Sequence, residues 1–259
     1  MREVICHYHI YKNAGTSFDH VLRESFGDRH LSFDGPFPFF TIDQEQLLRI
    51  IERKAGAVAF SSHQIQLPAP SVPGCRILPV VFLRDPVLRI ASIWRFKARF
   101  PDGTATSEAA GRMGFADWVD FCLNDPAEIV HVSNAQTRLL SAAPRARPES
   151  RRTPGRMEYD LARAEANLAG AAVGRADRFD EDIGAIARLS AARGLPLRPP
   201  GDLRLNVTDP DRGEPAARAL RVLGELAPDL RDRLLRANDQ DLRLNEIAGR
   251  RARDLREAA

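Results

Sequence analysis

The chain has 259 residues, of which 44% are hydrophobic and 28% are charged. This composition excludes a disordered chain and suits one α/β domain with a substantial core, so we expect a single domain over residues 1–259. The net charge is only +3, and the basic residues are almost all arginine. Because no zinc-finger, RNA-binding or helix-turn-helix signature accompanies them, we expect no nucleic-acid partner.

The three cysteines, Cys6, Cys75 and Cys122, are scattered and form no CxxC pair. We therefore predict reduced thiols and no zinc site. The chain enters a predicted strand almost at once, without the long apolar region of a signal peptide, and no apolar run has the length of a transmembrane helix. These features predict a cytoplasmic protein, and none of them indicates an oligomeric state.

Residues 9–17, His-Ile-Tyr-Lys-Asn-Ala-Gly-Thr-Ser, lie between a β-like run over residues 3–8 and a helix-like run over residues 18–26. A turn from strand to helix presents backbone N–H groups at the positive end of the helix dipole, which favours an anion. Gly15 lets the backbone approach a ligand, and Lys12 adds a positive charge. The stretch therefore predicts an anion-binding turn.

Thr16 and Ser17 can cap the predicted helix and offer hydroxyl groups. A nucleoside-triphosphatase loop would read G-x-x-x-x-G-K-[ST], with the lysine after the last glycine. Here Lys12 precedes Gly15, and no glycine opens the loop. The spacing argues against an ATP or GTP site, and an ordinary capped turn is the alternative interpretation.

A second turn from strand to helix follows the apolar run over residues 76–83. Arg84 stands at the end of the predicted strand, Asp85 suits a helix cap and Pro86 suits the first helical turn. Ser92 lies about two helical turns further along. Arg84 can offer a forked pair of donors to phosphate oxygens, although a plain capped turn would look similar.

Residues 57–63 form a short apolar strand that ends in His63. Catalytic groups in open parallel sheets gather at the carboxyl ends of strands, which makes His63 a candidate general base. The other histidines lie in or beside the first strand, on a helix or in loops, and we interpret them as structural. They are His7, His9, His20, His30 and His131.

Together these motifs resemble the glycan-type sulfotransferases that use 3′-phosphoadenosine 5′-phosphosulfate (PAPS), such as heparan sulfate 2-O- and chondroitin sulfotransferases, in a short bacterial-type form. The 5′-phosphosulfate loop of that family often reads H-x-P-K-[TN]-x-G-T-[ST], which residues 9–17 match except for Tyr11 in place of proline. The 3′-phosphate motif, R-D-P-x-x-R-x-x-S-x-[YW], is matched by residues 84–94. The resemblance implies a three-layer, P-loop-like α/β fold with a mostly parallel central sheet flanked by helices.

The resemblance also implies transfer of a sulfuryl group from PAPS to an acceptor hydroxyl on a carbohydrate or glycoconjugate, without a metal. Lys12 would stabilise the leaving nucleotide, 3′-phosphoadenosine 5′-phosphate (PAP), and His63 would take the acceptor proton. Arg84 and Ser92 would bind the 3′-phosphate. The loop that would cradle the 5′-phosphate consists of Asn13, Ala14, Gly15, Thr16 and Ser17.

Three further segments resemble parts of the same family. Residues 133–140 match N-x-Q-T-R-x-L, and residues 171–181 resemble a late strand and helix in which Ala176-Asp177 replaces Thr-Glu. Residues 204–208 match R-x-N-V-[ST], a loop that often closes over the cofactor, which implies cofactor contacts for Arg204, Asn206 and Thr208. The residues of the first segment either hold the acceptor or cofactor or only support the loop: they are Asn134, Gln136 and Arg138.

The remaining segments are interpreted from composition and period. Residues 142–155, rich in proline and arginine, predict a flexible insertion or, alternatively, a basic lip for an anionic acceptor. Residues 28–40 predict an aromatic loop that either lines an acceptor cleft or packs on the core. Residues 100–114 lack a hydrophobic period, which predicts a mobile loop. A helical carboxyl end is predicted over residues 214–259, with a frayed tail from residue 250.

Two other classes of function stay open. A P-loop nucleotide or small-molecule kinase would need Mg²⁺ and a Walker lysine, which the position of Lys12 disfavours. A non-catalytic member of the same fold that binds PAPS or another nucleotide is left open by the departures at Tyr11 and Ala176-Asp177.

Overall fold

The structure is a computed structural model that describes residues 1–37, 40–141, 160–199 and 213–258. The predicted insertion at residues 142–155 and the predicted cofactor contacts at residues 204–208 lie outside the described residues.

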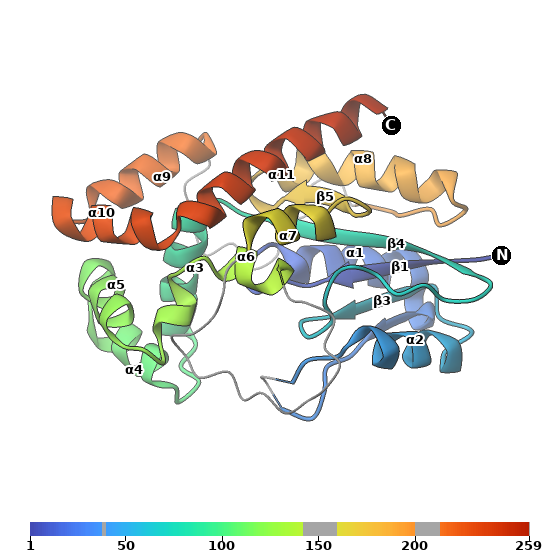
Figure 1. Cartoon of the computed structure of the whole chain (residues 1–259), viewed down its shortest axis with the longest axis horizontal. Helices are drawn as coiled ribbons and strands as arrows, with labels where there is room; N and C mark the ends of the chain where they lie inside the picture. Colours follow the sequence, from blue (N-terminus) through green and yellow to red (C-terminus); the bar gives the residue numbers. More distant parts are fainter. Residues whose placement is uncertain (38–39, 142–159, 200–212, 259) are drawn as a thin grey trace.

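A β-sheet of five strands forms the centre of the molecule (Figure 1), in the order β2-β3-β1-β4-β5. All its strand pairs are parallel, in keeping with the apolar runs expected of strands buried on both faces. The predicted α/β class, with a mostly parallel sheet flanked by helices, is therefore confirmed. The strands are β1 (Arg2–Tyr8), β2 (His30–Ser32), β3 (Ala59–Ser62), β4 (Cys75–Leu83) and β5 (Ala172–Arg175).

Helices cover both faces of the sheet, which gives three layers. Because side chains alternate along a strand, Val4 and Cys6 of β1 pack on one face and Ile5 packs on the other. The face of Ile5 is covered by α1 (Gly15–Phe26) and α8 (Phe179–Ala192). The opposite face is covered by α2 (Gln44–Arg53), α6 (Ala135–Leu140), α7 (Leu161–Asn167) and α11 (Asp239–Ala258).

A third apolar cluster lies at one end of the molecule, where helices pack mainly on one another (Figure 1). At its centre Trp118 is fully buried, and its indole N–H donates to the carbonyl of Thr106 (2.9 Å). The helices of this cluster are α3 (Pro86–Arg99), α4 (Ala105–Arg112), α5 (Phe115–Asn124), α9 (Pro215–Gly224) and α10 (Pro228–Ala237). The described residues also contain the short 3₁₀ turns η1 (Gly27–Arg29), η2 (Ile129–His131) and η3 (Ala176–Arg178).

Two predictions about irregular segments are wrong. Residues 100–114 were expected to be a mobile loop, but they contain α4. The hydroxyl of Thr104 caps this helix by accepting from the amide of Ser107. The buried face of α4 consists of small residues, so the sequence shows no clear hydrophobic period there. The carboxyl end is not frayed, because α11 continues to Ala258 and Arg256 forms an ion pair with the buried Asp182 of α8.

Within the described ranges, no helix combines the length and apolar character needed to cross a membrane.

The carboxyl ends of β1 and β4 lie next to each other at the centre of the sheet. The chain that leaves β1 leads to β2 at one edge, whereas the chain that leaves β4 leads to β5 at the other edge. Open α/β sheets bind their ligands at such a divergence, outside the carboxyl ends of the strands. The two predicted phosphate motifs follow these two strands.

Candidate functional site

The loop between β1 and α1 has a strained backbone. Lys12 and Ala14 both adopt left-handed conformations, with φ angles of 66° and 60°. This conformation costs a residue other than glycine roughly 1–2 kcal/mol, and such strain is concentrated at functional sites. Ala14 is the N-cap of α1 and contributes no side-chain hydrogen bond, so the prediction that Thr16 or Ser17 caps the helix is wrong. Both residues lie inside the first turn.

The amide groups of this loop are only partly available to an anion. The amide of Asn13 donates to the carbonyl of Ile10 (3.1 Å), and the amide of Ser17 donates to that of Ala14 (3.0 Å). The amides of residues 14–16, at the start of the helix, have no backbone acceptor in the described part of the chain. Of the amides expected to form a cradle, from Asn13 to Ser17, those of Asn13 and Ser17 therefore already donate within the protein.

The ammonium group of Lys12 lies over the ring of Phe96 in α3, 4.0 Å from the ring centroid. No carboxylate of the described residues forms an ion pair with it. Burial, and to a lesser extent the charge of Arg84, lowers the pKa of Lys12 from 10.5 to about 8. A bound anion would favour the charged form of Lys12, because it would supply the missing opposite charge.

Arg84 follows β4 and contacts the loop after β1. Its Nη1 donates to the carbonyl oxygen of Lys12 (3.1 Å), and its Nε donates to Oδ1 of Asp177 (3.0 Å). The other oxygen of Asp177, Oδ2, accepts from the amide of Asp85 (3.0 Å). Since Asp177 lies in η3 directly after β5, one guanidinium joins the carboxyl ends of β1, β4 and β5.

Gln136 holds the two motifs together from α6. Its Oε1 accepts from Nδ2 of Asn13 (2.6 Å) and from the amide of Arg84 (3.0 Å), while its Nε2 donates to the carbonyl of Arg84 (2.9 Å). Nδ2 of Asn13 also donates to the carbonyl of Phe82 (2.9 Å). Asn13 and Gln136 are both almost fully buried, so their side chains connect β1, β4 and α6.

Asn134 and Arg138 also contact the protein itself. Oδ1 of Asn134 accepts from the amides of Gln240 (3.1 Å) and Asp241 (3.0 Å) at the start of α11. Nη2 of Arg138 donates to the carbonyl of Val130 (2.8 Å). Of the two roles that the sequence left open for Asn134, Gln136 and Arg138, these contacts favour support of the loop.

Ser92, expected at the 3′-phosphate, lies on the inward side of α3 with 2% of its surface exposed. Arg89 of the same motif is buried too, and its Nε donates to the carbonyl of Tyr11 (3.1 Å). Burial lowers the pKa of Arg89 to about 10. The side chain of Arg84 is 13% exposed and is therefore more accessible to a phosphate than Ser92.

His63 follows β3, which lies beside β1, as the prediction of a strand-end histidine required. Its Nδ1 lies 3.1 Å from Oδ2 of Asp34, and the side chain is about half exposed. The pKa of His63 is lowered, first by partial burial and then by neighbouring His9, whereas Asp34 acts in the opposite direction. A lowered pKa favours the neutral imidazole, which is the form that a general base needs.

His9 joins His63 to the predicted phosphate loop. The two imidazole rings stack with centroids 3.8 Å apart. His9 also lies against Gly15, where an added Cβ atom would lie 2.0 Å from Cδ2 of the ring. Gly15 thus makes room for His9, a close contact within the protein that the sequence did not predict.

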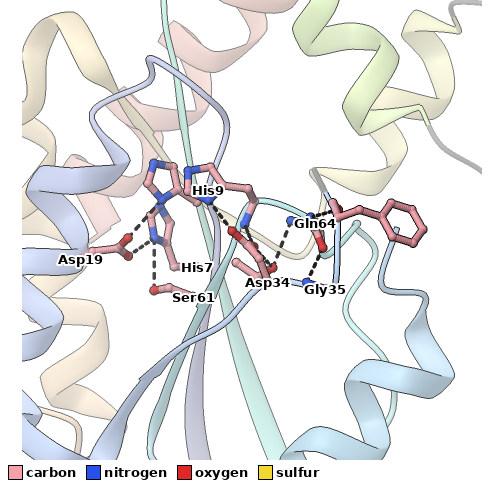
Figure 2. A network of polar contacts seen from close by, with 10 residues as sticks. His7, His9, Asp19, Asp34, Gly35, Ser61 and Gln64 are labelled. Atoms are coloured by element: carbon pink, nitrogen blue, oxygen red, sulfur yellow. Dashed lines mark hydrogen bonds and ion pairs between the residues drawn. The ribbon is translucent and has the colours of Figure 1, made fainter. Parts of the chain in front are cut away.

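The carboxylate of Asp19, on α1, faces the imidazole rings of both His7 and His9 (Figure 2). Its two carboxylate oxygens lie 2.7 Å from Nδ1 of His7 and 3.0 Å from Nδ1 of His9. Burial raises the pKa of Asp19, but the hydrogen bonds from both histidines outweigh it and hold that pKa well below its usual range. Among the described residues, this trio has donor atoms close enough to hold a metal ion, which would displace the two hydrogen bonds.

Sequence reasoning missed three acidic residues at this edge of the sheet: Asp19, Asp34 and Asp177. Asp177 stood out in the sequence only as part of the Ala176-Asp177 departure after a late strand, and its contact with Arg84 had no signal. Asp19 lies one helical turn after Gly15 and could have been placed on the same helix face. Asp34 carried no signal, since its contact with His63 depends on how residues 33–37 pack against the end of β3.

Comparisons with known proteins give limited information. No family model matches the chain. The chain is similar to an uncharacterized protein of Archaeoglobus fulgidus, with 30% identity over 137 residues, covering 51% of this chain and 54% of that protein. The chain thus spans about half the length of the curated relative that it matches. The description of that relative contains no activity to transfer.

Proposed function

We propose that this protein is a sulfotransferase that moves a sulfuryl group from PAPS to an acceptor hydroxyl, with carbohydrates or glycoconjugates as the acceptor class. The observation that carries the proposal is the contact between the two motifs: Nη1 of Arg84 donates to the carbonyl of Lys12 at the divergence of β1 and β4. PAPS carries phosphate at both ends of its ribose, so its recognition needs two anion sites at a short, fixed distance.

The charges at the site support the same proposal. Lys12 has no carboxylate partner in the described residues, and its pKa is lowered, so a multiply charged anion would be stabilised there. Helix α1 begins at Gly15, three residues after Lys12, and the positive end of its dipole favours an anion there. The guanidinium of Arg84 is held by Asp177 and by the carbonyl of Lys12, so it needs little reorganisation on binding.

The proposed reaction is an in-line displacement at sulfur. The acceptor oxygen forms a bond to sulfur as its proton passes to Nε2 of His63. The bond between sulfur and the bridging oxygen of the 5′-phosphate breaks, and its electron pair stays on that oxygen, which the ammonium of Lys12 stabilises. Positioning and charge stabilisation account for most of the catalysis in the analogous transfer of phosphoryl groups.

The direct test is sulfuryl transfer from ³⁵S-labelled PAPS to a panel of oligosaccharides, glycolipids and small alcohols. The proposal expects a labelled product together with stoichiometric PAP. A protein that binds PAP but labels no acceptor would instead be a non-catalytic member of the fold. Transfer of phosphate from ATP in the presence of Mg²⁺ would overturn the proposal in favour of a kinase.

A further inference from the structure

We infer that Asp34 is the residue that positions His63, by holding its imidazole in the tautomer whose Nε2 is unprotonated and able to accept the acceptor proton. This inference rests on the proposed function for the identity of the proton donor. The tautomer itself is a property of the protein alone and can be measured without any substrate.

Both oxygens of Asp34 are used at the end of β3. Oδ1 accepts from the amide of His63 (2.9 Å) and from the hydroxyl of Ser62 (2.8 Å), while Oδ2 faces Nδ1 of His63 (3.1 Å). The first two hydrogen bonds fix the carboxylate independently of the imidazole. A carboxylate can only accept, so Nδ1 of His63 carries the proton and Nε2 has a lone pair.

The loop that carries Asp34 is held in place by neighbouring contacts (Figure 2). The amide of Gly35 donates to Oε1 of Gln64 (2.5 Å), and Nε2 of Gln64 donates to the carbonyl of Phe37 (3.0 Å). A Cβ atom at Gly35 would lie 2.3 Å from Cδ1 of Phe40, so the loop packs closely here. Residues 33–37 therefore pack against the base and its neighbours at the carboxyl end of β3.

The arrangement also stabilises the charge that develops on the base. When Nε2 takes the acceptor proton, the resulting imidazolium keeps its Nδ1–H directed at the carboxylate of Asp34, and no proton moves to Asp34. The other groups that face His63 are His9, stacked 3.8 Å away, and Asp19 behind it. Asp34 is the carboxylate in direct contact with the ring, so its charge acts most strongly on the imidazolium.

The first experiment is a long-range ¹H–¹⁵N correlation spectrum of the full chain with ¹⁵N-labelled histidine at pH 7.5, with His63 assigned through a His63→Gln variant. We expect the Nδ1–H tautomer for His63 in the unmodified protein. In Asp34→Asn the side-chain amide can donate to Nδ1, and we expect the Nε2–H tautomer. An Nε2–H tautomer in the unmodified protein, or the same tautomer in both proteins, would overturn the inference.

The matched control is Asp28→Asn, which makes the same change at an exposed carboxylate in η1. We expect it to keep the Nδ1–H tautomer and near-normal kcat. Asp34→Asn should lower kcat on the order of a hundredfold, with little change in the Kd for PAP, because general-base catalysis is lost while the nucleotide site is untouched.

The two proposals fail differently. If no acceptor is sulfated by the unmodified protein, the proposed function fails, and the spectra still decide whether Asp34 sets the tautomer. If sulfation occurs and Asp34→Asn has unchanged kcat and an unchanged pH profile, the role of Asp34 is refuted and the sulfotransferase stands.

Discussion

The loops that follow β1 and β4 both bring a basic residue to the same edge of the sheet, but they hold it in different ways. Arg84, after β4, is fixed by Asp177 and by the backbone of the other loop. Lys12, after β1, sits on a strained backbone and an aromatic ring, without a carboxylate partner in the described residues. Under the proposed function, this difference predicts separate roles: Arg84 would bind the nucleotide, and the ammonium of Lys12 would stabilise the reacting group.

The largest effect is expected at Lys12. Lys12→Ala should lower sulfuryl transfer by about a thousandfold, because the charge that forms on the leaving oxygen loses its stabilising ammonium. The measurement is PAP release under saturating PAPS, and the matched control is Lys54→Ala, which removes an exposed lysine at the end of α2. A near-normal rate in Lys12→Ala would contradict the proposed role of Lys12 in stabilising the leaving oxygen.

Substitution of His63, which follows β3, is expected to affect turnover and to leave nucleotide binding unchanged. His63→Ala should lower kcat roughly a hundredfold because the general base is lost, with the Kd for PAP nearly unchanged. His20→Ala, which alters a partly exposed histidine on α1, is the control. If nucleotide binding collapses in His63→Ala, the stack with His9 supports the phosphate loop and His63 is structural.

Arg84 should act on binding. Arg84→Ala should weaken the binding of PAP by roughly 10- to 100-fold, which is the contribution of one or two charge-assisted hydrogen bonds. It should weaken the binding of adenosine 5′-phosphate much less. Calorimetry with both nucleotides measures the difference. Arg188→Ala on α8 is a control for net charge. The affinity of Arg84→Lys for PAP should lie between the affinities of Arg84→Ala and Arg188→Ala. Equal losses for both nucleotides would contradict recognition of the 3′-phosphate by Arg84.

A smaller effect is expected from pH. In the free protein the pKa of Lys12 is about 8, so the charged form that attracts an anion is lost as pH rises through 8. The affinity for PAP should therefore fall between pH 7 and pH 9, by up to about tenfold, and binding should raise the pKa of Lys12. In Lys12→Ala this dependence should disappear. A slope of the same size in that variant would assign the titration to another group.

Gly15 tests the packing that joins the loop after β1 to the histidines. Gly15→Ala places a methyl group on the ring of His9 and should lower the free energy of unfolding by about 1–3 kcal/mol, as overpacking does. Gly111→Ala in α4, where a Cβ meets open space, should be neutral or slightly stabilising. Denaturant unfolding measures both, and equal stability of the two variants would show that His9 moves aside freely.

Local rules predicted the elements that frame the site. Asp85 caps α3 by accepting from the amides of Val87 and Leu88, with Pro86 in the first turn, as the sequence indicated. The same kind of local contact begins α2, where Asp43 and Gln46 form a capping box. Such caps depend on residues that are neighbours in the chain, and the order of apolar runs similarly predicts a parallel sheet.

Contacts between distant segments were not predictable. The ion pair of Arg84 with Asp177 joins residues 93 positions apart, and Asp34 lies 29 positions from His63. The left-handed N-cap at Ala14 had no signal either, since alanine has no preference for that conformation. Sequence therefore located the strand ends, and tertiary packing determined which acid accompanies each basic residue or histidine.

The most direct test of the account is titration calorimetry of the full chain with PAP, and separately with ATP and Mg²⁺. A site built from the loops after β1 and β4 should bind PAP without Mg²⁺ and more tightly than ATP with Mg²⁺, because Arg84 recognises a 3′-phosphate that ATP lacks. Preferential binding of ATP with Mg²⁺, or no binding of PAP, would contradict the account.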